Sequence, residues 1–223
     1  MFQISITSVF SIFNKLVSLL YDKAKSVNIW PSREQIKAFM PPVFQKTFPT
    51  CRVIIDTTEF YIHKPINPTS QQASFSTYKN HNTLKSLIGI APNGAISFIS
   101  DLWMGSISDK EITLRSGILE LLEEGDTVLA DRGFTVLEPE FQKRKLSLFT
   151  PFFLKNKIQF PIDERSENKK VSSHRCHVER AIGRIKNYKI LDKTIPCSLK
   201  NIEEIYFVCV FLCNFTENLL MFK

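Results

Sequence analysis

Apolar residues near the start of the chain recur at the spacing of a helix. Ile6, Phe10, Phe13 and Val17 follow one another at three- or four-residue intervals. This period places their side chains on one face, so residues 5–25 are predicted to form a helix. A second, shorter helix is predicted after Ser32, whose hydroxyl is suited to capping the first turn of the motif PSREQIKAF.

Further along, β-branched and aromatic runs alternate with helical patterns. Strands are predicted over residues 51–62 and 147–153, in a hairpin around Pro92-Asn93-Gly94, and in the stretch TVLADRGF from Thr127. Helices are predicted after Ser108, with Glu111 completing a capping box, and over residues 172–191 and 198–220. Residues 67–82 are predicted to be a loop or a β excursion, and residues 155–170 a charged, exposed excursion. This alternation predicts an α/β domain with a mixed sheet flanked by helices.

Composition narrows the class of protein. The chain has 223 residues, is 43% hydrophobic and carries a net charge of +7, which favours a polyanionic partner such as nucleic acid. Its five cysteines include no CxxC pair and suggest buried thiols in a reducing compartment. The N-terminus lacks a basic region and a cleavage site, and the apolar run at residues 205–215 is too short to span a bilayer. We expect a soluble intracellular protein with no membrane partner.

Three acidic residues stand out against the apolar pattern. Asp56 follows the run RVII, Asp131 follows TVLA, and Glu179 lies at the edge of the apolar stripe of the helix HVERAIGRIK. Polar groups near the carboxyl ends of strands commonly form ligand sites in α/β sheets. Clustered carboxylates repel one another unless one is protonated or a cation lies among them. Magnesium prefers such oxygen ligands, and two ions about 3.5–4 Å apart promote displacement at phosphorus.

The same residues also have plain structural interpretations. An aspartate after a strand is often a turn residue that binds its own backbone. Glu179 can form an ordinary surface pair with Arg175, four residues earlier, and the basic residues that follow it can form a solvated face. Spacing alone leaves these alternatives open.

Several longer motifs resemble those of a known protein family. The segments RVIIDTTEFYI, YKNHNTLKSLIGIAPNGAISFIS, GSISDKEITLRSGILELLEEGDTVLADRGF and HRCHVERAIGRIKNYKIL occur in this order. Together they resemble the DDE superfamily endonucleases of the Harbinger-like transposase group, over roughly residues 28–218. The resemblance implies an RNase H-like fold that cuts DNA with two divalent cations, Mg²⁺ or Mn²⁺.

The resemblance also assigns roles to residues. It implies that Asp56, Asp131 and Glu179 are the catalytic, metal-binding triad, with Asp109 and Glu59 as accessory acids. Nucleic-acid contacts are expected from basic residues along the chain, namely Arg132, Arg175, Arg180, Arg184 and Lys186. Residues 1–27 are expected to be a partial helix-turn-helix remnant, 28–50 a helical lead-in and 51–218 the endonuclease domain.

The resemblance further implies DNA as substrate, a separate DNA-binding partner protein, a homo-oligomer, and a location in the nucleus, with the cytoplasm as alternative. Because the N-terminal motif is incomplete, a catalytically silent adaptor that binds DNA or protein is an open alternative. A structural zinc site at His174, Cys176 and His177 is a third, although the sequence shows no fourth ligand at suitable spacing.

Overall fold

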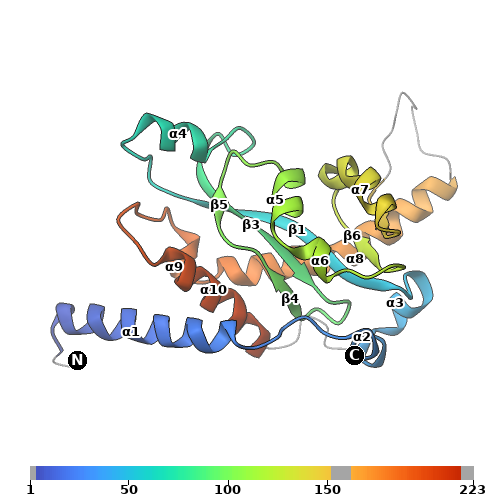
Figure 1. The fold of residues 1–223 in the computed structure, drawn as a ribbon, viewed down its shortest axis with the longest axis horizontal. Helices are drawn as coiled ribbons and strands as arrows, with labels where there is room; N and C mark the ends of the chain where they lie inside the picture. The colour runs from blue at the N-terminus through green and yellow to red at the C-terminus, as the bar shows by residue number, and fades with distance from the viewer. Residues whose placement is uncertain (1–3, 152–161, 217–223) are drawn as a thin grey trace.

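The computed structural model describes residues 4–151 and 162–216, which form an α/β fold (Figure 1). Its elements follow in the order α1 (Ile6–Lys25), α2 (Arg33–Phe39), α3 (Pro42–Thr47), β1 (Cys51–Tyr61), α4 (Pro68–Ser74), β2 (Phe75–Ser76), β3 (His81–Ile90), β4 (Ile96–Ile99), β5 (Trp103–Met104), α5 (Asp109–Arg115), α6 (Ile118–Leu121), β6 (Thr127–Leu129), η1 (Arg132–Leu137), α7 (Glu138–Lys143), β7 (Ser147–Phe149), α8 (Ile162–Lys186), α9 (Lys189–Asp192), α10 (Ile202–Leu212) and η2 (Cys213–Phe215).

One mixed sheet organises the described part of the chain. Its seven strands run in the order β2-β3-β1-β6-β7, and β4 and β5 also pair with β3. The central strand β1 is antiparallel to β3 and parallel to β6, which in turn is parallel to β7. The predicted α/β fold with a mixed sheet is confirmed, and the arrangement is consistent with an RNase H-like fold.

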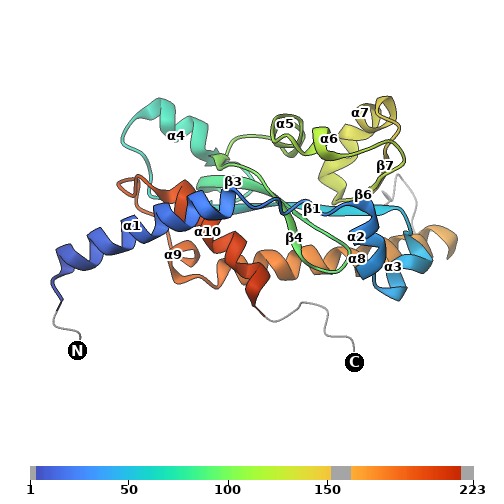
Figure 2. The same ribbon diagram turned by 60° about the horizontal axis from the view of Figure 1, so that its bottom comes forward.

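Both faces of the sheet are covered, which explains why its central strands are apolar on both sides. In β1, Ile54 packs into the core beneath α8 and α10, whereas Val53 and Ile55 pack into a second core with α5, α6 and η1. Figure 2 shows these two helical layers on opposite sides of the sheet. The alternation in β1 therefore decides which side chains face α8.

The first helix is confirmed where the apolar spacing predicts it. Ser5 caps α1 by accepting a hydrogen bond from the backbone N–H of Ser8. The helix meets α10 through Tyr21, whose ring lies edge-on to Phe207 with 5.4 Å between centroids. Within the described ranges, neither this helix nor any other is long and apolar enough to cross a membrane.

Three expectations about local structure are corrected. The helix predicted after Ser108 divides into α5 and α6, because Gly117 adopts a left-handed conformation with φ of +84°. The segment 67–82 contains the short helix α4, whose first turn is capped by Asn67, followed by β2. Residues 162–170, predicted as part of an excursion, form the start of α8, while residues 152–161 lie outside the described residues.

A buried group of hydroxyls joins the sheet to α10. The side chain of Ser86 in β3 is within hydrogen-bond distance of both Ser100 and the Tyr206 hydroxyl. All three residues are buried, so their polar atoms depend on one another rather than on water.

This group leads to a stability prediction. Tyr206→Phe removes one partner of a buried hydroxyl while keeping the ring, so we expect unfolding free energy to fall by about 1 kcal/mol. Urea denaturation measures the change. Tyr61→Phe, at a half-exposed ring, is the matched control and should change stability by less than about 0.5 kcal/mol. Equal effects of the two variants would contradict the role of the buried group.

Candidate active site

A cavity of about 450 Å³ lies beside the middle of β1 and is lined both by α8, on one face of the sheet, and by α5 and η1, on the other. Residues from β1, β3, α5, η1 and α8 line it. They include all five acids singled out in the sequence, namely Asp56, Glu59, Asp109, Asp131 and Glu179. The structure thus brings together side chains that are far apart in sequence.

The register of the parallel strands explains why the two aspartates meet. Ile54 of β1 is paired with Leu129 of β6, and both pack into the core beneath α8. Because side chains alternate along a strand, Asp56 and Asp131 point to this same face two residues further on. Asp56 is therefore not at the end of β1, as the apolar run suggested, but in its interior, at the point where β6 stops pairing with it.

The third acid comes from the helix that covers this face. Val178 and Ile185 of α8 are fully buried against the sheet. Glu179 follows Val178 at the edge of this buried stripe, and 59% of its side chain is exposed to solvent. The helix thus presents a hydrated carboxylate to the rim of the cavity.

Arg175 ties two of the acids together. Its guanidinium lies 3.0 Å from Asp131 Oδ1 and 3.7 Å from Glu179 Oε1, and only 10% of the side chain is exposed. Its Nε is buried without a hydrogen-bond partner among the described residues. Sequence reasoning expected Arg175 to bind nucleic acid. The structure places it within the acidic cluster, and contact with a phosphate stays a prediction.

The electrostatics of the cavity act most strongly on Asp56. Burial raises the pKa of this carboxyl to about 6, and the negative charges of Asp131 and Glu179 add to the increase. Arg175 and a hydrogen bond from the backbone N–H of Thr57 oppose it. A cation bound beside Asp56 would stabilise its ionised form, which burial and the neighbouring acids disfavour.

The two accessory acids already have protein partners. Asp109 Oδ1 accepts hydrogen bonds from the Lys85 ammonium and the Thr57 hydroxyl, both at 2.8 Å. Glu59 is buried and accepts a hydrogen bond from the Thr83 hydroxyl at 2.7 Å. Both acids line the cavity, and their role as accessory ligands stays a prediction.

Sequence reasoning missed Lys85, which is buried within the apolar strand β3. Its ammonium binds Asp109 and also donates to the backbone carbonyl of Ile107 at 3.3 Å. A lysine inside an apolar strand was the available signal, since a buried lysine almost always has a charged partner.

The predicted nucleic-acid residues divide into two groups. Lys186 lines the cavity, where burial and the nearby charge of Lys79 lower the pKa of its ammonium. Arg132 and Arg180 are exposed. Arg184, in contrast, turns toward the C-terminal segment and donates a hydrogen bond to the Cys213 carbonyl at 2.7 Å. Their contacts with nucleic acid stay predictions.

Gly133 has a packing role in this cavity. It is not among the described glycines with positive φ, so its backbone conformation does not require a glycine. A Cβ atom at this position would lie 3.0 Å from Asp109 Oδ2, and Asp109 is itself held by Lys85 and Thr57. The close approach of η1 to α5 therefore requires the absence of a side chain.

Gly133→Ala is expected to lower unfolding free energy by about 1 kcal/mol, because Asp109 or η1 must shift. Gly183→Ala is the control: it lies in α8 with no atom within 4 Å of the added Cβ, so it should be neutral or raise stability. Thermal denaturation of the two variants measures the difference. A Gly133 variant as stable as the Gly183 variant would contradict the packing argument.

The cavity suits hard divalent cations in its chemistry. Its acidic side chains offer carboxylate oxygens, the ligands that Mg²⁺ prefers, and burial of Asp56 favours a neutralising cation. Within residues 4–151 and 162–216, no three acidic, imidazole or thiol groups already stand in a metal-coordinating arrangement. Arg175 instead supplies the positive charge beside Asp131 and Glu179.

The histidines and cysteine of α8, His174, Cys176 and His177, also form no metal-coordinating arrangement in the described part of the chain. His174 is buried between the rings of Phe44 and Phe48, and its Nε2 lies 3.0 Å from the Thr47 hydroxyl. This imidazole packs α8 against α3. The geometry gives no support to the zinc interpretation.

The mixed sheet, its two helical layers and the acid-lined cavity define an α/β protein consistent with an RNase H-like fold. The family model of the DDE superfamily endonuclease matches residues 55–214, and the chain belongs to this family. The match includes Asp56, Asp131 and Glu179. Neither the curated proteins nor the solved structures yield a match to the chain.

Proposed function

We propose that this chain is a metal-dependent DNA endonuclease derived from a Harbinger-like transposase. The observation that carries the proposal is the convergence of Asp56, Asp131 and Glu179 on one cavity in a chain of the DDE endonuclease family. The net charge of +7 favours a nucleic-acid substrate.

Each acid has a distinct role in this proposal. Asp56, the most buried of the three, would hold both cations, and Asp131 and Glu179, which are half-exposed, would each hold one. Two bound Mg²⁺ or Mn²⁺ ions would supply an activated water or hydroxyl and a charge that stabilises the leaving oxygen of the phosphodiester. Arg175 holds the carboxylates of Asp131 and Glu179 in place at the rim.

The basic residues around the cavity bind the DNA backbone. Lys186 lines the cavity, and Lys79 lies beside it, with its ammonium 4.6 Å from the centre of the Tyr78 ring. Arg132 and Arg180 extend this positive surface into solvent. Ammonium and guanidinium groups contact phosphate oxygens without reading base sequence, so these contacts position the substrate.

The proposal extends to partners and location. We propose that recognition of the DNA sequence depends on a separate DNA-binding protein or on a homo-oligomer. We further propose that the protein acts in the nucleus, with the cytoplasm as the alternative location.

A second function, a catalytically silent adaptor, is favoured by one observation. Arg175 already neutralises part of the acidic cluster through its contacts with Asp131 and Glu179. Such a protein would bind DNA through its basic surface without cutting it.

One experiment separates the two functions. Purified protein is incubated with supercoiled plasmid in Mg²⁺, in Mn²⁺ or in excess chelator, and Mn²⁺ binding is measured by calorimetry. The endonuclease is expected to nick DNA only with metal, and to lose nicking in Asp56→Asn, Asp131→Asn and Glu179→Gln. DNA binding without Mn²⁺ uptake or cleavage would establish the adaptor instead.

A further inference from the structure

Helix α1 packs against the rest of the protein along one of its faces. Val17 and Ala24 are buried on this face, and the Tyr21 ring packs on α10. Nearer the start of the helix, the Asn201 side-chain amide donates a hydrogen bond to Asn14 Oδ1 at 2.8 Å. Positions 14, 17, 21 and 24 follow the helical period, so these contacts occupy a single face of α1.

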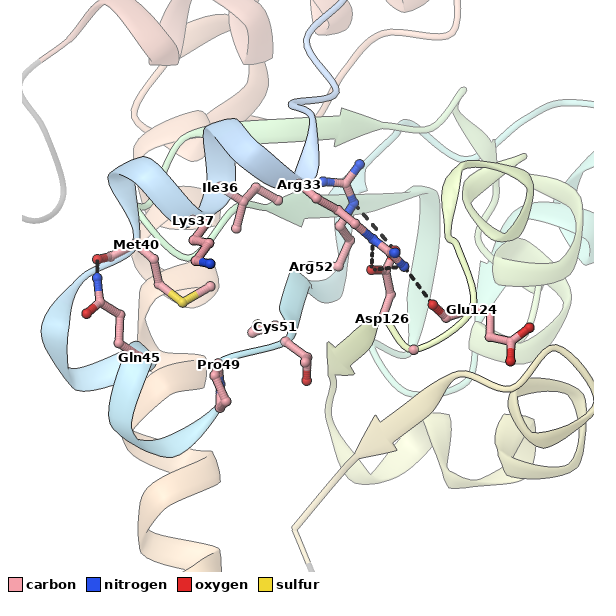
Figure 3. Close-up of a pocket in the computed structure, with 12 residues that line it drawn as sticks. Arg33, Ile36, Lys37, Met40, Gln45, Pro49, Cys51, Arg52, Glu124 and Asp126 are labelled. Carbon is pink, nitrogen blue, oxygen red and sulfur yellow. Dashed lines mark hydrogen bonds and ion pairs between the residues drawn. The ribbon is translucent and has the colours of Figure 1, made fainter.

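The end of α1 is also fixed in place through the helix that follows it. Residues 26–32 lead from α1 into α2. Arg33, the first residue of α2, donates hydrogen bonds to Asp126 Oδ1 at 2.9 Å and to the Glu124 carbonyl at 2.7 Å, as Figure 3 shows. Contacts along its side and at its end therefore set the position of α1, while Figures 1 and 2 both show its N-terminal end extending beyond α9 and α10.

A second apolar face of α1, here called the outer stripe, is turned toward solvent. Its six side chains are between 37% and 58% exposed, namely Val9, Ile12, Phe13, Leu16, Leu19 and Leu20. The last three members repeat the first three at an interval of seven residues, which is the pattern of a helix that packs on another helix. At 3.6 residues per turn, the outer stripe is centred about 140° around the helix from the face that packs on α10.

The outer stripe is large for an apolar surface in water. Half-exposed aliphatic and aromatic side chains expose roughly 90 Å² each, so the six together expose roughly 500 Å². Two such stripes in contact would bury about 1,000 Å², which is enough for a specific interface between proteins. Lys15 is the one charged residue in the sequence from Ile6 to Tyr21, so the stripe itself carries no charge.

Two charged residues beside the outer stripe indicate which partner it fits. Lys15 and Asp22 are exposed, lie on the same edge of the stripe, and have no ion pair within residues 4–151 and 162–216. They are seven residues apart, which is too far for a pair within one helix. If two α1 helices pair antiparallel, centred between Leu16 and Leu19, Lys15 of each copy lies beside Asp22 of the other copy. The edge of the stripe is therefore complementary in charge to itself.

A lipid surface fits this helix less well. Helices that lie in a membrane interface carry many lysines and arginines on a polar face opposite the apolar one. In α1 the face opposite the outer stripe packs on α10, and apart from Lys15 the basic residues of the helix are confined to its last turn. A second copy of the chain matches both the apolar and the charged features.

We propose that the outer stripe is the contact between two copies of this chain, whose α1 helices pair antiparallel. Leu16 of each copy packs on Leu19 of the other, and the two Lys15–Asp22 pairs fix the orientation. Each contact occurs twice, as in any interface with twofold symmetry. The interface contains no residue of the acidic cavity, so it does not rest on the proposed endonuclease function.

Sedimentation equilibrium on the full chain, in chelator and without DNA, tests the proposal. We expect a reversible monomer–dimer equilibrium with a Kd in the micromolar range. Leu16→Glu, at a position that is half-exposed in the single chain, should weaken dimerisation at least about a hundredfold, because the contact would bury two carboxylates. Val43→Glu on α3, at a position that is 60% exposed, is the control and should dimerise as the parent does. A monomeric parent, or a Leu16 variant that dimerises normally, would overturn the proposal.

Charge reversal tests the antiparallel orientation. Lys15→Glu and Asp22→Lys each turn two attractive pairs into repulsive ones, so each variant should weaken dimerisation about tenfold. An equimolar mixture of the two variants restores both attractive pairs in the heterodimer, and a chain with both substitutions restores them in the homodimer. Both are expected to dimerise with the affinity of the parent. If neither recovers this affinity, the antiparallel pairing is wrong.

Flotation with vesicles of phosphatidylcholine and phosphatidylserine measures the competing lipid contact. We expect the parent protein to stay unbound. A parent that floats with the vesicles, together with a Leu16→Glu variant that does not, would assign the outer stripe to a lipid surface and overturn the proposal.

Discussion

Asp56→Asn is expected to reduce metal-dependent DNA cleavage by at least about a thousandfold while making the metal-free protein more stable. The loss of activity follows from the proposed role of Asp56 as the carboxylate shared by both cations, since an amide brings no charge to them. The gain in stability follows from its environment. Burial and two neighbouring acids disfavour the ionised form of this side chain.

The sign of the stability change can be worked out from the pKa. The carboxyl has a pKa of about 6 in the folded protein, above the ordinary value of about 4. Between these values the folded state binds more protons than the unfolded state, so stability falls as pH rises through this window. At pH 8 the full cost is present, on the order of 2–3 kcal/mol, and it is absent in Asn.

Urea denaturation in chelator at pH 4 and pH 8 measures this effect. The Asn variant should gain stability over the parent at pH 8 and lose that advantage near pH 4. Asp101→Asn is the control, because its side chain is 69% exposed and its hydration is retained. A variant that loses both cleavage and stability at pH 8 would show that Asp56 serves the fold instead.

Much of this arrangement could be predicted from the sequence, because the strands that are buried in the core have a clear apolar pattern. The β-branched run before Asp56 and the short run before Asp131 mark strands that are buried on both faces. Alternation then fixes the face to which each aspartate points once Ile54 is paired with Leu129. The edge position of Glu179 follows from the helical period.

Other features depend on tertiary contacts that the spacing of residues in the sequence does not reveal. The break between α5 and α6 results from the left-handed backbone of Gly117, and an isolated glycine is equally compatible with a continuous helix. The lack of a side chain at Gly133 reflects an approach to Asp109, 24 residues away, that only the packed structure reveals. For Arg175, the helical period allows a surface pair with Glu179 but cannot place Asp131 at its other nitrogen.

Arg175→Gln is expected to tighten Mn²⁺ binding about tenfold and to reduce cleavage. The guanidinium is a fixed positive charge beside two acids of the proposed metal site, so it repels an incoming cation. It also holds those acids in place, so its removal lets their carboxylates adopt unproductive orientations. Calorimetry with Mn²⁺ and the plasmid assay at saturating metal measure the two effects separately.

Arg175→Lys is the matched variant, because it keeps the charge but not the two-pronged geometry. It should bind Mn²⁺ as the parent does and cleave poorly. Mn²⁺ affinity that falls in the Gln variant would show instead that orientation of the acids outweighs charge repulsion in metal binding.

Removing Arg175 and removing its partner Asp131 should change the stability of the metal-free protein by different amounts. At pH 5, below the pKa of about 6 of Asp56, that carboxyl is mostly protonated and depends little on Arg175. Asp131 and Glu179 are 50% and 59% exposed, so both carboxylates remain hydrated when Arg175 is removed, and stability at this pH should change little. Asp131→Asn instead deprives a guanidinium that is 10% exposed of its nearest acid, at a cost of about 1–3 kcal/mol. Because the buried partner is the cation, the loss of an acid should destabilise the metal-free protein more than the loss of the arginine.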